Sequence, residues 1–404
     1  MKIQYDTPKQ DKQFKQGLIM WAMLAFFCFF QFFMQISGNL MTSAWQTSFH
    51  LNQAGVGLLS SSFFYGYALI QVPAGFLLDA FGIQKMIRIA LSIFLLGLIL
   101  FASTHSFYIG LLGRVLLGAG AGFAFIGMVF TSASWFGPKL LTIFVGLGEM
   151  LSMLMTSAGQ AIAPSLILHY GWRPLLFGFI GTGLIFLGFI WVWLRNPPHY
   201  QPLHLKVWPQ FKMHWQTAIT TPSVWLAGIY CCGLFGVITL FASLWGNPYL
   251  QQRYHLDYLS ASHFIALIPL GFGLGCPLIG FLNERYICHR LLIILLTFSL
   301  LGCTLLMMYL GTNATVLGVS LFFMGFLGGG NVIAFYIAER SVAPQVRGMA
   351  IGLCNAITIA AGIIFQPLIG MLWPHLGFHA MLVFPGLILF ACLMTLVYKK
   401  PPVA

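Results

Sequence analysis

The sequence predicts an all-α membrane protein with twelve transmembrane helices, arranged as two related bundles of six. Three observations support this prediction: the composition, the spacing of apolar stretches, and an internal repeat. Of the 404 residues, 59% are hydrophobic and 6% are charged, and the mean hydropathy is +0.89. Soluble domains carry about 25% charged residues, so this chain could not cover a water-exposed surface. The composition therefore excludes a soluble enzyme, a nucleic-acid binder and a disordered scaffold.

The apolar residues fall into stretches of membrane-spanning length. A helix needs about 20 mainly apolar residues to cross a bilayer. The stretches of this kind are 18–41, 54–78, 86–104, 106–131, 140–166, 174–194, 222–246, 260–282, 290–311, 315–337, 348–372 and 378–398. The first is too long, and too polar in its second half, for a cleaved signal peptide.

The longest connection between two stretches is rich in proline, as linkers often are. It covers residues 195–221 and contains Pro197, Pro198, Pro202 and Pro209. We therefore expect an N-terminal six-helix bundle over residues 1–194, a cytoplasmic linker over 195–221, and a C-terminal six-helix bundle over 222–404.

The distribution of basic residues predicts an orientation. Of the 19 Lys and Arg residues, sixteen fall before the first stretch or in connections on one face. Arg173 and Arg253 fall on the other face, and Arg114 lies inside a stretch. Because positive charge is retained on the cytoplasmic side, we expect both termini in the cytoplasm and the protein in the plasma membrane, the inner membrane of a bacterium. The net charge of +12 is thus a topology signal, and no nucleic-acid partner follows from it.

The two halves of the sequence repeat each other at a separation of 205 to 207 residues. Each match falls at the corresponding place in a set of six stretches, which predicts two bundles related by a pseudo-two-fold axis along the membrane normal. The matched features are Gly75, Asp79 and Lys85 with Gly280, Glu284 and Arg290; Pro138 and Gly146 with Pro344 and Gly352; and Gly118 and Gly122 with Gly325 and Gly329.

These motifs resemble those of the major facilitator superfamily over essentially the whole chain. The segment from Gly75 to Arg88 is similar to the superfamily's signature loop between helices 2 and 3, although Ala80 and Ile83 stand where basic residues are common. Arg114, Gly118 and Gly122 resemble its helix 4 motif. The resemblance implies alternating access, with gating residues at Asp79, Lys85 and Arg88 and, in the second half, at Glu284, Arg285 and Arg290.

Two further segments resemble carriers of small organic solutes. They are Gln71-Val-Pro73-Ala-Gly75 and Trp245-Gly-Asn-Pro-Tyr249, and they are similar to the branch with lysosomal dipeptide carriers and nutrient importers of intracellular bacteria. The Gly-Pro signature that drug/proton antiporters carry in helix 5 is not matched, since the stretch reads Gly159-Gln-Ala-Ile-Ala-Pro164.

One acidic and one basic residue lie well inside the apolar stretches. Glu149 and Arg114 are each about 12–14 Å from the membrane surface at which their helix enters, at 1.5 Å per residue. In a core of about 30 Å the two side chains reach similar depths. An ionisable group at this depth is by default functional, so we expect either a proton-coupling carboxylate and polar anchor, or a buried ion pair between helices 4 and 5.

Amide side chains form a polar stripe on the first stretch. Gln31, Gln35 and Asn39 are spaced by four residues and share a helix face. Amides that face lipid would be costly, so the stripe faces either a substrate cavity or a neighbouring helix. Further candidate substrate-binding residues in the other half are Tyr230, Asn331, Asn355 and Gln366.

These observations predict a secondary active transporter for a small polar or zwitterionic solute, such as an amino acid, a dipeptide or an organic acid. Because the sequence contains no ATP-binding motif, we expect an ion gradient to supply the energy, and Glu149 makes protons the expected coupling ion. The alternatives are an exporter of a drug-like compound or siderophore, and a transport-incompetent receptor or sensor on the same fold. We expect no enzyme activity, no cofactor and no metal. The expected partners are the solute, protons and the lipid bilayer, with a monomeric carrier.

Overall fold

The protein is helical throughout the part of the chain that its computed structural model describes. The described residues are 8–198, 200, 207–285, 289–311, 313–343 and 346–397, and none of them lies in a β-strand. Glu284 and Arg285 lie in a helix, but their side chains are outside the described set.

The first half consists of seven long or medium helices, followed by a separate helix in the linker. They are α1 (Pro8–Ile36), α2 (Gly38–Phe49), α3 (Gln53–Phe81), α4 (Ile83–Ser103), α5 (Phe107–Phe136), α6 (Pro138–Tyr170), α7 (Trp172–Trp193) and α8 (Val207–Thr220).

The second half repeats this plan with more interruptions. Its elements are α9 (Pro222–Gly236), η1 (Val237–Trp245), α10 (Gly246–Tyr254), α11 (Tyr258–Arg285), α12 (His289–Leu310), α13 (Ala314–Gly328), η2 (Gly329–Asn331), α14 (Val332–Arg340), α15 (Arg347–Leu376), η4 (Gly377–Leu382) and α16 (Val383–Val397).

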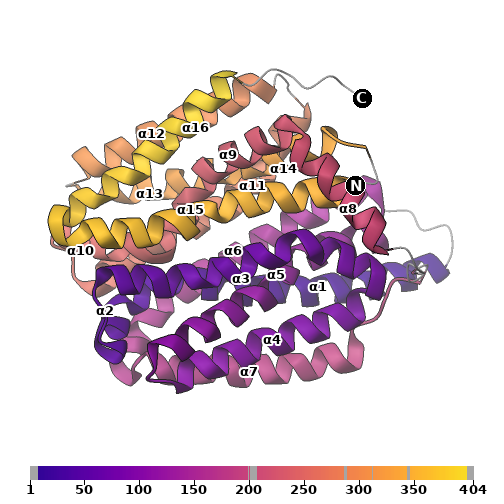
Figure 1. Cartoon of the computed structure of the whole chain (residues 1–404), viewed down its shortest axis with the longest axis horizontal. Coiled ribbons are helices and arrows are strands. Elements are labelled where there is room, and N and C mark those ends of the chain that lie inside the picture. Colours follow the sequence, from indigo (N-terminus) through magenta and orange to yellow (C-terminus); the bar gives the residue numbers. More distant parts are fainter. Residues whose placement is uncertain are drawn as a thin grey trace.

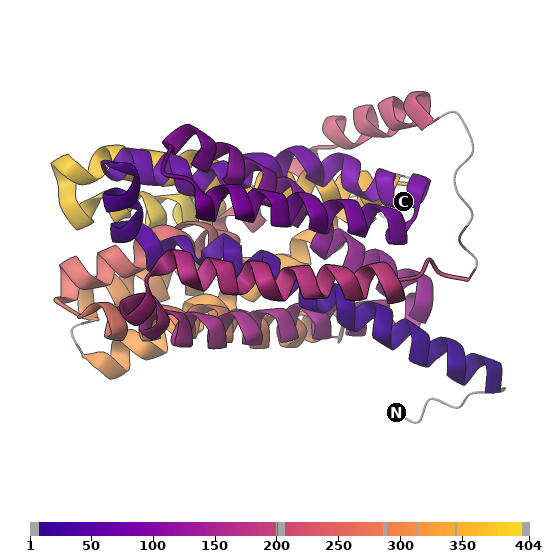
Figure 2. The ribbon, with the colours of Figure 1, turned by 90° about the horizontal axis from the view of Figure 1, so that it is seen from below.

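The long helices run side by side along the longest axis of the molecule (Figure 1). Helices of the first half lie together, helices of the second half lie together, and α3 and α15 meet between them. The start of α1 and the linker helix α8 lie at the same end (Figure 2). We call this the basic end, because it carries Lys12, Lys15, Lys85, Arg88 and Lys212.

Eleven continuous helical stretches in the described ranges are long and apolar enough to cross a membrane. The last, Arg347–Met394, has 48 residues, or about 70 Å at 1.5 Å per residue, more than twice a hydrocarbon core of about 30 Å. Its α15 segment ends at Gly377, whose φ of 55° lies in the left-handed region, and α16 turns back toward the basic end (Figure 1). The stretch is long enough for two crossings, and the count of twelve stays a prediction.

Two predicted membrane helices, 18–41 and 222–246, are interrupted in their second halves. The first breaks at Ser37, between α1 and α2, where the Ser37 hydroxyl donates to the carbonyl oxygen of Met34 (3.0 Å). The seventh changes from α-helix to the nine-residue π-helix η1, whose residues are all buried. Interruptions expose backbone groups, and inside a membrane protein these groups need partners from neighbouring helices.

The two halves are in close contact from the end opposite the basic end to about the middle of the molecule. A Cβ atom on Gly370 would lie 2.5 Å from the carbonyl oxygen of Gln53, and one on Gly352 would lie 2.8 Å from that of Gln71. One turn nearer the basic end, on the same face of α15, a Cβ on Gly348 would meet nothing within 4 Å. Helices α3 and α15 therefore diverge toward the basic end.

Three side-chain hydrogen bonds also join the halves in the region away from the basic end. The bonds run from Asn39 Nδ2 to the carbonyl oxygen of Ala242 (2.5 Å), from the Tyr258 hydroxyl to that of Leu40 (2.8 Å), and from the Ser157 hydroxyl to that of Ala266 (2.7 Å). The molecule is thus closed at the opposite end.

Substitution of Gly118 is expected to destabilise the fold, because α3 and α5 pack backbone to backbone there. A Cβ on Gly118 would lie 1.8 Å from the carbonyl oxygen of Phe63, so Gly118→Ala must push the helices apart at a cost of about 1–3 kcal/mol. The measurement is thermal unfolding of the purified protein in detergent. The matched control is Gly181→Ala on α7, where a Cβ would meet nothing within 4 Å. Equal melting temperatures for the two variants would contradict this packing.

Candidate solute pathway

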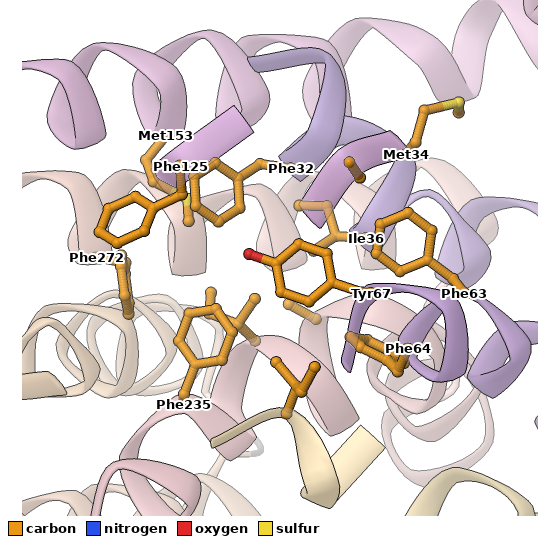
Figure 3. Packing of buried hydrophobic residues seen from close by; sticks show 14 of the residues in the cluster. Phe32, Met34, Ile36, Phe63, Phe64, Tyr67, Phe125, Met153, Phe235 and Phe272 are labelled. Atoms are coloured by element: carbon orange, nitrogen blue, oxygen red, sulfur yellow. The ribbon is translucent and has the colours of Figure 1, made fainter. Parts of the chain in front are cut away.

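A small cavity lies between the two halves near the middle of the bundle. We call it the central cavity, and its volume of about 20 Å³ has room for about one water molecule. Side chains from both halves line it: Phe32, Gln35, Tyr67, Phe125, Glu149, Phe235, Asn331, Phe335, Asn355, Thr358 and Ile359. Figure 3 shows the Tyr67 hydroxyl pointing toward the space between the rings of Phe32 and Phe235. In this conformation the cavity is nearly filled by its own side chains.

Among the described residues that line the central cavity, Glu149 on α6 is the one acidic residue and none is basic. Its side chain is 4% exposed. Among the described residues, none forms a hydrogen bond or an ion pair with its carboxylate. A buried carboxylate without partners is energetically costly, which marks it as a site where a proton or a solute group can bind.

Arg114 does not pair with Glu149, so the ion pair that similar depths suggested is not present in this structure. The guanidinium instead donates to the carbonyl oxygens of Met34 (3.2 Å), Leu59 (3.4 Å) and Ser60 (3.1 Å). It also lies 5.3 to 5.7 Å from the ring centres of Trp45, Phe63 and Phe101. Similar depth in the membrane does not determine which way a side chain points around its helix axis. Arg114 points toward α1 and α3 rather than toward α6. Its contacts are those of a residue that holds helices together.

The predicted amide stripe on the first membrane helix is divided between two locations. Gln31 donates to Gln35 (2.6 Å), and Gln35 lines the central cavity. Asn39 lies beyond the Ser37 break and donates to Ile36, Gln160 and Ala242. Each of the three amides keeps one buried atom without a partner, namely Gln31 Oε1, Gln35 Nε2 and Asn39 Oδ1. Unpaired buried polar atoms are rare in folded proteins.

The candidate residues of the second half also separate into groups. Asn331 and Asn355 line the central cavity, and Asn355 donates to Gln71 Oε1 (2.8 Å) across the halves. Gln366 donates to the carbonyl oxygen of Thr239 and to the Ser243 hydroxyl, both on η1 (2.6 Å each). Tyr230 does not line the central cavity, and its hydroxyl donates to the carbonyl oxygen of Gly330 (3.0 Å).

Several pathway residues escape the sequence-based prediction. Tyr67 and Thr358 line the central cavity, and Gln160 bonds Asn39 at the closed end. Tyr67 and Gln71 are spaced by four residues, as are Gln31 and Gln35, and this spacing could have revealed a second polar stripe. The phenylalanines of the cavity give no such signal, because the chain contains 39 of them.

Three of the expected gating residues, Asp79, Lys85 and Arg88, form no ion pair with another described residue. Of these, Asp79 is exposed. Lys85 lies over the Phe81 ring (5.1 Å), and Arg88 donates to the carbonyl oxygen of Trp191 (2.6 Å). Arg290 is exposed, and the side chains of Glu284 and Arg285 fall outside the described residues. A neighbouring ion pair joins Arg347 to Glu339 (3.3 Å) at the basic end.

Comparison with known proteins identifies the fold and the family. The chain is 23% identical over 278 residues to the uncharacterised transporter YybO of Bacillus subtilis, covering 64% of this chain and 63% of that protein. It is 22% identical to the probable chloroplastic anion transporter 4 of Oryza sativa, covering 83% of this chain and 61% of that protein. The chain thus spans less than two thirds of the length of these relatives.

A solved structure with the same fold is that of the D-xylose-proton symporter. It superimposes with a TM-score of 0.72 at 14% identity, covering 96% of this chain and 98% of that one. The family model for the Major Facilitator Superfamily matches residues 21–353 and 277–404. The chain therefore belongs to the major facilitator superfamily and is a multi-pass membrane protein.

Proposed function

We propose that this protein is a proton-coupled secondary transporter that moves a small polar solute by alternating access. The observation that supports this most is Glu149, a buried carboxylate without partners in a cavity to which both halves contribute. A rocking motion of the halves would change the hydration of Glu149, and burial and hydration favour different protonation states of a carboxylate. Glu149 could then take up a proton in one access state and release it in the other.

The lining of the central cavity indicates the polarity of the solute. Gln35, Asn331 and Asn355 offer amide donors and acceptors, and Gln35 keeps an unpaired donor. A solute with hydroxyl, amide or amine groups would satisfy these atoms. The carboxylate of an organic acid would find no cationic partner among the lining residues. Because the cavity is nearly filled in this conformation, solute binding requires the halves to separate.

The two halves are bonded together at one end and diverge toward the basic end, which corresponds to one state of an alternating-access cycle. We infer that the basic end faces the cytoplasm of a bacterial inner membrane, as the positive-inside distribution favours, so this conformation faces inward. Opening the other end requires the bonds of Asn39, Tyr258 and Ser157 across the halves to break. In that state Asp79, Lys85 and Arg88, with Glu284, Arg285 and Arg290, would approach the other half and hold the basic end closed. The carrier works as a monomer.

Glu149→Gln is expected to abolish proton coupling while leaving solute exchange intact. Gln keeps the shape but cannot titrate, and no charge is left unpaired because Arg114 does not bind Glu149. The melting temperature should therefore change little. Proteoliposomes loaded with a pH-sensitive dye are exposed to amino acids, dipeptides, organic acids and sugars, and a coupled solute acidifies the interior. Counterflow of that solute should persist in the variant.

The control for this experiment is Asp257→Asn, which changes an exposed acid outside the membrane helices. Proton uptake that survives Glu149→Gln unchanged would refute the assigned role. Loss of counterflow together with coupling would make Glu149 a solute ligand or a structural residue instead.

Arg114→Met is expected to lower stability rather than to alter coupling. It removes three buried hydrogen bonds, at a cost of at least about 2 kcal/mol, although the carbonyl oxygens of Met34 and Leu59 keep the hydroxyl donors of Ser37 and Ser62. Thermal unfolding in detergent measures the effect, with Arg340→Met on the exposed surface as control. A stable Arg114→Met protein that has lost proton coupling would assign Arg114 to the coupling step.

The orientation predicts which side of the membrane reaches α8. Lys212 is exposed on α8, so a thiol reagent that cannot cross the membrane should label Lys212→Cys in inside-out vesicles but not in intact cells. The parent chain is the control, since seven of its cysteines are buried or partly buried. Labelling of Lys212→Cys in intact cells would show that α8 faces outward and would contradict the inferred orientation.

A further inference from the structure

A second, larger cavity lies at the end of the molecule opposite the basic end. Its volume is about 370 Å³, and we call it the vestibule. Both halves line it, with residues of α2 and α3 on one side and of α10, α11 and α15 on the other. Its polar and aromatic lining residues include Asn39, Gln46, Gln53, Gln252, Tyr258 and Trp373.

A layer of hydrogen bonds separates the vestibule from the central cavity. The Asn39 amide donates hydrogen bonds to the carbonyl oxygen of Ala242 and to the Gln160 side chain. The Gln366 amide donates to the carbonyl oxygen of Thr239 and to the Ser243 hydroxyl. The vestibule and the central cavity share no lining residue. The vestibule is therefore a separate cavity on the outer side of these hydrogen bonds, and not an extension of the central cavity.

The vestibule is lined by groups that bind uncharged polar molecules. Asn39 is 2% exposed and its Oδ1 has no partner, and the Oε1 atom of Gln53 is also buried without a partner. Gln46 and Gln252 add amides that can both donate and accept. The Trp373 ring, stacked at 5.0 Å on Trp245, supplies a flat apolar surface. Amides around an aromatic face match a molecule with hydroxyl groups on its edge and C–H groups on its face.

Among the described residues, no acidic or basic residue lines the vestibule. Asp257 and Arg253, the sequence neighbours of the lining residues Tyr258 and Gln252, have other contacts. Asp257 accepts bonds from the Ser260 backbone N–H (3.0 Å) and hydroxyl (2.6 Å), which hold the pKa of this carboxyl below its usual range. Arg253 lies over the rings of Tyr254 and Phe378. A zwitterion or an anion would thus lose its hydration without gaining a partner charge.

We propose that the vestibule is a second solute-binding site, specific for uncharged, hydroxyl-rich molecules of the sugar or polyol class. This inference rests on the proposed transport function and narrows its solute class, since the amides of the central cavity suit the same molecules. Solute reaches the vestibule first from the outside and the central cavity second.

Occupancy of the vestibule also acts on the closed end. Asn39 and Tyr258 line the vestibule and donate the bonds that join the halves. A solute that contacts both halves at once binds the closed state more tightly than the open one, so it shifts the population toward closure. External solute at high concentration therefore slows the opening of this end.

Equilibrium dialysis of the purified full-length protein tests the site, with labelled D-glucose and myo-inositol as uncharged probes and diglycine and succinate as charged ones. The test variant is Gln53→Leu with Gln252→Leu, which removes two vestibule amides. The matched control is Gln216→Leu, an exposed amide on α8 at the basic end. We expect an uncharged probe to bind, and the test variant to weaken that binding about tenfold through the loss of its hydrogen bonds.

Thermal unfolding keeps this result interpretable, because a test variant with an unchanged melting temperature is folded. Binding that is equal in the test variant and the control, or binding of diglycine or succinate in place of the uncharged probes, overturns the inference. Absence of binding by every probe means that water alone fills the vestibule, and also overturns it. Proton-driven uptake by the parent chain is a separate readout, and it persists if only the vestibule assignment fails.

Discussion

Polar atoms inside an apolar bundle need partners, and this constraint organises the molecule. The break at Ser37 and the π-helix η1 free backbone carbonyls where no water is at hand. Arg114 donates to the carbonyl of Met34 before the break, Asn39 donates to that of Ala242 on η1, and Gln366 to that of Thr239. These polar side chains therefore stabilise the irregular helices, and Asn39 also connects the two halves. Packing elsewhere is largely apolar, and backbone contacts at glycine bring the helices together.

The architecture could be predicted from the sequence because a bilayer imposes simple rules on it. Length and hydropathy predicted the membrane helices, the basic residues predicted their orientation, and the 205-to-207-residue repeat related the two halves. The interruption at η1 could not be predicted, since Val237–Trp245 is a mainly apolar segment without proline or glycine. The end of α15 within the stretch Arg347–Met394 is easier to explain from the sequence, because Gly377 follows it and has a positive φ.

The candidate site was predicted only in part. One cavity is lined by four of the predicted residues, Gln35, Glu149, Asn331 and Asn355. Polar residues of membrane helices face the bundle interior or a cavity because contact with lipid is costly. Their partners could not be predicted, because depth in the membrane says nothing about rotation around a helix axis. Arg114 thus lies at a similar depth to Glu149 but faces other helices. The vestibule was missed as well, since its amides are ordinary residues at helix ends until folding brings the two halves together.

The bonds that close the opposite end have a consequence for sequence divergence. Asn39, Tyr258 and Ser157 each donate a side-chain hydrogen to a main-chain oxygen, on Ala242, Leu40 and Ala266 respectively. Every residue type offers such an oxygen, so the accepting positions can drift without loss of the bond, whereas the donors cannot. We therefore expect natural variation at this gate to be one-sided, with selection acting on the donor of each pair. The Asn355–Gln71 bond, between two side chains, requires both partners to change in concert.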